Sequence, residues 1–317
     1  MRQATLALCA LLLAGCAASG TTTGATRLAT DADIDAAEHA PLNAYTKSGH
    51  WNEPIAPFRV IGNVYHVGTQ GVNAYLIATP KGHVLIDGVV PQSVPQIVDN
   101  IRALGFDIAD VKYLLNTHAH YDHAGGLAGL QRASGAIFVA SAADRATLER
   151  GDIGYGPSAG MLFPPIRVDR IIEDGDSVHV GNTTLTAHLT PGHTPGCTSW
   201  RLTTNDDDGT PRSVFIHCSA TVAGQALVPE SYPGMVEAFR ASFDKVARIH
   251  ADVFLANHPN FFDFEAKHAR LRAGDANAFV DPEGLQRYND AMRKAFEEEL
   301  AKQQAAASYQ LKPQERH

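Results

Sequence analysis

The segment VKYLLNTHAHYDHAGG, from Val111 to Gly126, decides the fold and also points to the chemistry. Its first half is apolar and predicts a buried strand. Its second half places three histidines and one aspartate within six residues. In an extended chain, side chains at positions i, i+2 and i+4 share a face, so His118, His120 and Asp122 can point together. His123 breaks this period because the chain turns there into a helix. Two ligand pairs are therefore expected side by side at the end of a strand, where open α/β sheets place their ligands.

Two further histidines also follow predicted strands directly. His193 lies in LTPGHTPG and His258 lies in VFLANHPN. We predict that His118, His120 and His193 hold one metal ion, and that Asp122, His123 and His258 hold another. Three nitrogens, or two nitrogens and a carboxylate, suit Zn²⁺, and three protein ligands per ion leave an open position for catalysis. A non-catalytic zinc-binding or zinc-storage protein is the alternative.

The chain around these histidines alternates hairpins with strand–helix units. Strands are expected over residues 58–69, 72–79, 82–90, 111–117, 136–141, 169–181, 183–190, 198–204, 213–221 and 251–257. Helices are expected over residues 93–105, 122–134, 142–151, 235–249 and 283–306. The pattern forms two similar blocks, about 54–170 and 171–290, and predicts an α/β fold in which two sheets pack face to face with helices outside.

The N-terminus reads as an export signal over residues 1–15, with one positive charge, an apolar run and small residues. Its end, LLAGC, resembles a bacterial lipoprotein box with Cys16 as the lipidated residue, which would tether the chain to a membrane. Ordinary cleavage after Ala17 or Ala18 is the alternative, and either route predicts an exported, periplasmic protein. Residues 16–50 are expected to be a tether and leading segment, 51–295 the domain, and 296–317 a charged helix end and tail.

Composition excludes one class of partner. The 317 residues carry a formal charge of −8 and no basic run, so a nucleic-acid partner is not expected. Export permits disulfides. Cys197 and Cys218 lie at the edges of two strand-like runs joined by the polar turn NDDDGTPR, which predicts a hairpin with either a disulfide or two buried free thiols.

The HxHxDH cluster followed by PGHTPG resembles the metallo-β-lactamase superfamily, over about residues 50–290. The resemblance implies the αβ/βα sandwich, in agreement with the two blocks. Several other branches of the superfamily place a metal-bridging aspartate on the strand after the third histidine, and residues 213–221 contain none. With His123 and Ser219, the sequence is most similar to subclass B3.

The resemblance also suggests roles around the metals. Ser219 and Thr221 would bind the carboxylate of the substrate, or be ordinary strand hydroxyls. The Gly/Pro-bounded loop 154–165 would form a flap over an apolar side chain, or pack down. Asp87 would orient the ligand loop without being a ligand. The flap residues expected to contact substrate are Tyr155, Met161, Leu162 and Phe163.

The activity implied by this resemblance is hydrolysis of β-lactam antibiotics, namely penicillins, cephalosporins and carbapenems. A hydroxide bound between two zinc ions would attack the lactam carbonyl, and Asp122 would help to position it or relay a proton, without an acyl-enzyme. The alternative is a dizinc hydrolase of another ester or lactone. Neither the order of preference among β-lactams nor the oligomeric state follows from the sequence.

Overall fold

The strand that precedes the histidine cluster, β5 (Val111–Leu115), lies inside a seven-stranded sheet. We describe a computed structural model of the chain, for residues 27–43, 46–47 and 49–310. The sheet follows chain order from β1 to β7, antiparallel as far as β4 and parallel from there on. Its other strands are β1 (Phe58–Ile61), β2 (Val64–His66), β3 (Tyr75–Thr79), β4 (Gly82–Ile86), β6 (Ile137–Ser141) and β7 (Arg170–Ile172).

A second sheet has five strands in the order β12-β11-β10-β9-β8. All neighbours are antiparallel except β11 and β12, which are parallel. The strands are β8 (Ser177–Val180), β9 (Thr183–Leu189), β10 (Thr198–Asn205), β11 (Pro211–His217) and β12 (Val253–Ala256). The two predicted blocks therefore correspond to the two sheets, and the expected sandwich is confirmed.

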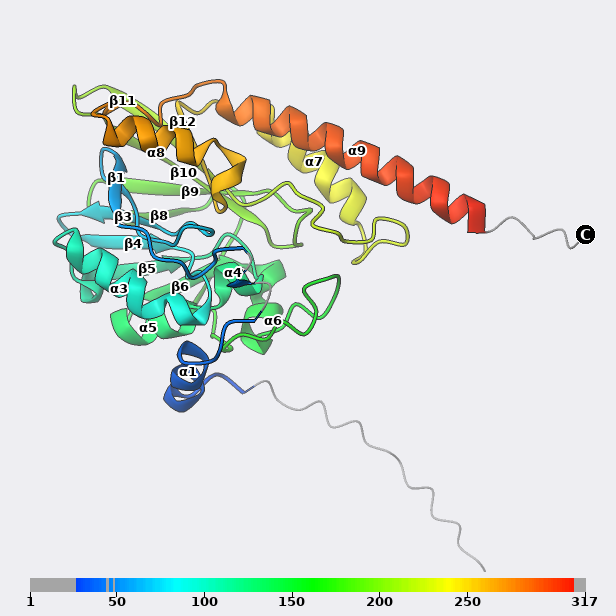
Figure 1. Cartoon of the computed structure of the whole chain (residues 1–317), viewed down its shortest axis with the longest axis horizontal. Coiled ribbons are helices and arrows are strands. Elements are labelled where there is room, and N and C mark those ends of the chain that lie inside the picture. The colour runs from blue at the N-terminus through cyan, green and yellow to red at the C-terminus, as the bar shows by residue number, and fades with distance from the viewer. Residues whose placement is uncertain (1–26, 44–45, 48, 311–317) are drawn as a thin grey trace, which may run out of the picture.

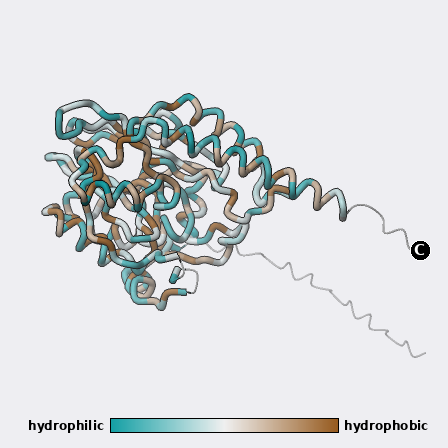
Figure 2. Tube along the Cα trace, turned by 45° about the horizontal axis from the view of Figure 1, so that its top comes forward, coloured by the Kyte–Doolittle hydropathy of each residue, from teal (hydrophilic) through white to brown (hydrophobic). Residues whose placement is uncertain are grey.

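Alternation along the strands divides the apolar residues between two cores. On β3, Tyr75 and Ile77 face the core between the sheets, whereas Leu76 belongs to the core under the outer helices. Successive strand residues point to opposite faces, so a sheet covered on both sides becomes apolar throughout. Every residue of β4 is accordingly buried. Figure 2 shows the hydrophobic stretches gathered inside the body of the molecule.

Helices cover the outer faces of both sheets (Figure 1). Those on the side of the first sheet are α1 (Asp31–Glu38), α3 (Val94–Ala103), α4 (Tyr121–Ala124), α5 (Leu127–Ser134) and α6 (Ala142–Arg150). Those on the side of the second sheet are α7 (Met235–Val246), α8 (Phe264–Arg272) and α9 (Gly284–Gln310). Three 3₁₀ turns connect them: η1 (Pro91–Ser93), η2 (Ile108–Asp110) and η3 (Pro259–Phe261). The final turns of α9 extend beyond the body (Figure 1).

Four strand and helix predictions need correction. Residues 58–69 form two antiparallel strands, β1 and β2, because the chain turns at Gly62, whose φ is +50°. Residues 169–181 form two strands, one in each sheet, because the chain turns at Gly175, whose φ is +86°. The strand predicted over 213–221 ends at His217. The helix predicted over 122–134 is interrupted at Gly125 and Gly126, where α4 gives way to α5. A Cβ on Gly126 would lie 2.1 Å from the Gly88 carbonyl oxygen, so this close approach of two loops requires glycine.

The two ends of the domain also differ from expectation. α1 lies in the segment predicted to be a tether, and Thr30 and Asp33 form a capping box at its start. At the other end, α9 runs through residue 295, as the helix predicted over 283–306 requires, and it ends four residues later than predicted, at Gln310. The predicted export signal and Cys16 lie outside the described residues. Among the helices that are described, none has the length and apolar character required to cross a membrane.

Candidate metal centre

Three loops and one short helix bring the six predicted ligands together at one edge of the sandwich. His118 and His120 lie in the loop that leaves β5, and Asp122 and His123 lie in the short helix α4 that follows. His193 follows β9, and His258 follows β12. The first sheet thus supplies four ligands and the second sheet supplies two. The site depends on the packing of one sheet against the other.

The first group consists of His118, His120 and His193. His118 Nε2 lies 3.0 Å from His120 Nδ1, and the His193 ring lies 4.6 Å from each of the other two rings, centroid to centroid. His193 Nδ1 donates a hydrogen bond to the Thr221 carbonyl oxygen at 2.8 Å, which leaves Nε2 free to bind a metal ion. Burial and the neighbouring histidines lower the pKa of His118 and of His120 well below 6.5. Burial also lowers the pKa of His193, to about 4, so the three rings are neutral at neutral pH, as metal ligands must be.

The second group consists of Asp122, His123 and His258. Asp122 Oδ2 lies 3.2 Å from His123 Nε2 and 3.1 Å from His258 Nε2, and these two nitrogens are 3.2 Å apart. His258 Nδ1 donates to the Gly71 carbonyl oxygen at 3.1 Å. Burial disfavours the Asp122 carboxylate, but the charge and hydrogen bonds of His123 and His258 outweigh burial and lower its pKa well below 3.8. Burial likewise opposes a charge on His123, yet Asp122 and Asp87 raise its pKa to about 9, so an ion that binds this group has to displace a proton from His123.

These donors fit two metal ions. Within each group the ligand atoms all lie within 4.8 Å of one another, and both groups are buried or nearly so. The rings of His118 and His123 are 4.3 Å apart, so the two groups are adjacent. A three-nitrogen set beside an N₂O set is the donor chemistry of zinc, with a position left open on each ion. When bound, such ions supply Lewis acidity and an acidified water.

Asp87 supports the ligand loop, the role that the sequence suggested. Its carboxylate accepts hydrogen bonds from Thr117 N and Oγ1, both at 2.7 Å, and from Asn116 Nδ2 at 3.2 Å. Its other neighbour is His123 Nδ1, 3.4 Å away. Asp87 itself has a φ of +63°, an uncommon backbone conformation for a residue other than glycine. The carboxylate thereby fixes both the start of the ligand loop and the ring of one ligand.

A second supporting carboxylate, Asp144, was missed. It accepts hydrogen bonds from Ala119 N at 3.0 Å, Thr194 Oγ1 at 3.2 Å and Gly196 N at 3.0 Å. One buried carboxylate thus joins the loop of His118 and His120 to the loop of His193. In the sequence Asp144 is only the third residue of a helix capped by Ser141. Nothing local in the sequence indicated this second role.

A cavity of about 630 Å³ opens over the two groups. Ser219, Thr221 and Met161 line it, as predicted, and Ser219 Oγ lies 3.2 Å from Thr221 Oγ1. Trp51, Tyr121, Asn260 and Phe261 also line it and were not predicted. Asn260 and Phe261 directly follow the ligand His258, so their place in the chain could have identified them. No lysine or arginine is among the described residues that line the cavity.

The other three flap residues lie elsewhere. Phe163 is buried in the core beneath the first sheet, because its N–H donates to the Gly151 carbonyl and draws the chain inward. Leu162 is 67% exposed and lines a separate groove beside residues 27–29. The Tyr155 ring packs edge-on against Tyr232, with centroids 5.4 Å apart. The expectation that these three line the substrate cavity is therefore corrected, and Met161 remains.

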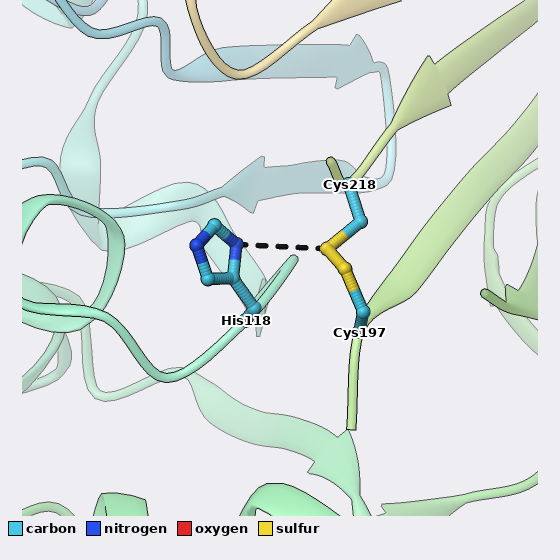
Figure 3. A group of neighbouring side chains, drawn as sticks. All are labelled: His118, Cys197 and Cys218. Atoms are coloured by element: carbon cyan, nitrogen blue, oxygen red, sulfur yellow. Dashed lines mark hydrogen bonds between the residues drawn. A yellow bond between two sulfur atoms is a disulfide. The ribbon is translucent and has the colours of Figure 1, made fainter. Parts of the chain in front are cut away.

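Cys197 and Cys218 form a disulfide, with their Cα atoms 5.8 Å apart. They flank the β10–β11 hairpin, whose register pairs Trp200 with Ile216. Of the two possibilities left open by the sequence, the structure has the bridge. It lies beside the His118 ring (Figure 3).

Comparison with known proteins agrees with this architecture. Residues 67–206 match the model of the metallo-beta-lactamase superfamily. The structure resembles BJP-1, a subclass B3 metallo-β-lactamase of Bradyrhizobium japonicum, with a TM-score of 0.77 and 43% identity over 82% of this chain and 99% of that one. It also resembles FEZ-1, a metallo-β-lactamase of Legionella gormanii, with a TM-score of 0.76 and 37% identity over 80% of this chain and 98% of that one.

Another relative is named for an activity other than β-lactam hydrolysis. The N-acyl homoserine lactonase AttM of Agrobacterium fabrum is 31% identical over 153 residues, which is 45% of this chain and 57% of the lactonase. The chain spans about half the length, or less, of the curated relatives that it matches first. The subclass B3 structures, by contrast, are matched over almost their whole length. With this fold, these two converging ligand groups and 43% identity to BJP-1 over almost the whole of that enzyme, the chain belongs to the metallo-β-lactamase superfamily.

Proposed function

We propose that this protein is a dizinc β-lactamase of the subclass B3 type, which hydrolyses the lactam ring of penicillins, cephalosporins and carbapenems. The similarity to BJP-1 carries the proposal, because it extends over 99% of that enzyme at 43% identity. We also propose that the protein is exported and acts in the periplasm, where its antibiotic substrates would meet it.

The residues around the cavity suit such a substrate. The hydroxyl groups of Ser219 and Thr221 line the cavity and can donate hydrogen bonds to a substrate carboxylate. Met161 and Trp51 offer apolar surface for a substituent. Asp122 also lines the cavity and can accept a hydrogen bond from the attacking water, which orients that water. All six ligand side chains are fixed by burial or by hydrogen bonds, so the lactam carbonyl meets a rigid site.

A lactone or ester hydrolase is the second candidate, because AttM is a lactonase by name. The segment after the third histidine speaks against it. Residues 213–221 contain no aspartate or glutamate. Neither ligand group draws a donor from that segment. The space between the two groups is thus left to substrate and water.

One comparison separates the two candidates. The zinc-loaded protein and a chelator-treated sample are given a chromogenic cephalosporin and, separately, a panel of N-acyl homoserine lactones. We expect turnover of the cephalosporin that chelation abolishes and added zinc restores, and little turnover of lactones. Efficient lactone hydrolysis with no cephalosporin turnover would assign the site to the second candidate.

A further inference from the structure

His118 faces two different sets of neighbours with its two ring nitrogens. Nε2 points to the metal centre, 3.0 Å from His120 Nδ1. Nδ1 points the other way and lies 3.5 Å from Cys218 Sγ (Figure 3). His118 is 1% exposed, and both cysteines are fully buried. A ligand of the metal centre therefore contacts a disulfide through its second nitrogen.

The distances around this disulfide match those of a metal site. The ligand atoms of His118, Cys197 and Cys218 all lie within 4.8 Å of one another. Tetrahedral zinc, with Zn–S near 2.3 Å and Zn–N near 2.0 Å, holds its nitrogen and sulfur ligands about 3.5 Å apart. The Nδ1–Sγ separation has this value already. Nδ1 also lies 3.2 Å from Thr117 Oγ1 and 3.4 Å from Asn257 Nδ2, contacts that a bound ion would replace, and the bond between the two sulfurs excludes an ion from the oxidised protein.

We propose that Cys197, Cys218 and His118 Nδ1 form a second metal site when the disulfide is reduced, and that the disulfide keeps this site closed. Two thiolates and an imidazole select a soft or borderline cation such as cadmium, copper(I) or zinc. A phosphine reductant supplies the two electrons: the phosphine and one water become the phosphine oxide, the S–S bond breaks, and two thiols form. Binding of the cation then releases one proton from each thiol.

The proposed site competes with the metal centre for His118. A neutral imidazole has one lone pair, on one of its two nitrogens, and carries a proton on the other. An ion bound at Nδ1 therefore moves the proton to Nε2 and withdraws His118 from the three-histidine group. In the oxidised protein the sulfurs cannot bind the ion, and His118 remains available to the metal centre. The disulfide thus protects the catalytic ligand set as well as the hairpin.

Cadmium titration tests this proposal, because bonds from thiolate to cadmium absorb in the ultraviolet and bonds to histidine or carboxylate do not. The full chain is titrated in oxidised form and after preparation under a phosphine reductant. The matched control is the Cys197→Ser, Cys218→Ser double variant. It retains the remaining cysteines of the chain, so any absorbance from those thiols appears in the control as well. A reduced His118→Asn sample tests the third ligand. Near-ultraviolet circular dichroism monitors folding in each sample.

We expect the thiolate–cadmium band from this pair in the reduced protein but not in the oxidised protein or the double serine variant, with saturation at one ion per pair of thiols. The His118→Asn sample should bind this ion at least tenfold more weakly. Absence of the band from folded, reduced protein, or equal affinity in His118→Asn, would overturn the proposal. Loss of the circular dichroism signal on reduction would also overturn it, because the donors would no longer be held together. The readout is independent of β-lactam hydrolysis, so it stands or fails separately from the proposed function.

Discussion

At the residue scale, removal of the Ser219 hydroxyl tests how the site recognises its substrate. The cavity offers no lysine or arginine among its described lining residues, so a substrate carboxylate there would be bound by neutral donors such as this hydroxyl. We expect Ser219→Ala to lose a hydrogen bond to a charged group, worth about 1.5–3 kcal/mol when it is direct. The loss should appear mainly as a higher KM, because the carboxylate is held alike in the ground and transition states. Zinc content should not change, and loss of a zinc ion on mutation would instead identify Ser219 as a ligand.

Another single residue, His217, should control how stability depends on pH. Burial, with a smaller contribution from the charge of His193, lowers its pKa to about 3. Between pH 6.5 and about 3 the unfolded chain binds a proton at this histidine and the folded chain does not. Stability therefore falls as pH falls through this window, by about 1.4 kcal/mol per pH unit for one group. The ring of His217 lies among Phe215, Phe254 and Tyr288, which favours phenylalanine as its replacement.

The measurement is chemical denaturation of metal-free protein at several pH values. Below pH 6.5, the free energy of unfolding of His217→Phe should fall less steeply with falling pH than that of the wild type. We expect the difference in slope to equal the contribution of one titrating group. Equal slopes in the variant and the wild type would show that His217 is protonated in the folded protein as well.

At the scale of elements, α9 supports a metal ligand from a distance. Gln303 accepts hydrogen bonds from Leu227 N at 2.6 Å and Val228 N at 3.2 Å, and donates to the Gln225 carbonyl at 3.3 Å. Gln225 is buried and donates to the His193 carbonyl at 2.9 Å. A chain of contacts therefore runs from the last helix to the loop of the third histidine. Loss of the residues that support a metal ligand can lower metal affinity tenfold to a hundredfold.

We expect Gln303→Ala to destabilise the protein by about 1–2 kcal/mol, since two backbone donors lose their acceptor. Metal affinity at the three-histidine group should fall by up to about tenfold. The matched control is Gln304→Ala, which removes an exposed glutamine from the next position of the same helix. Metal titration and thermal unfolding of both variants provide the comparison. If the two variants behave alike, α9 does not support the ligand loop.

At the scale of the whole molecule, the sequence predicted the features that hydrophobic periodicity and the chemistry of metal ligands specify. The strand before His118, the hairpin between Cys197 and Cys218, and the six candidate metal ligands all follow from local patterns. Contacts between segments far apart in the sequence do not. Asp144 was hidden because its hydrogen bonds reach Ala119, Thr194 and Gly196 in two other loops. Phe163 was misplaced because a Gly/Pro-bounded loop does not show which of its apolar residues turns inward.

The metal ions should act on the stability of the whole molecule, because the ligands come from both sheets. An ion held by His118, His120 and His193 links the loop after β5 to the loop after β9, and the second ion links α4 to the loop after β12. Ions that bind only the folded chain stabilise it by about 4 kcal/mol each at a thousandfold excess over Kd. We therefore expect chelation to lower the Tm and zinc to restore it. His258→Ala should remove most of the contribution of the second ion and retain that of the first, because the three-histidine group keeps all its donors. Differential scanning calorimetry with zinc analysis measures both. If His258→Ala lost both ions together, the two groups would form one cooperative site, and the division into two triads would be wrong.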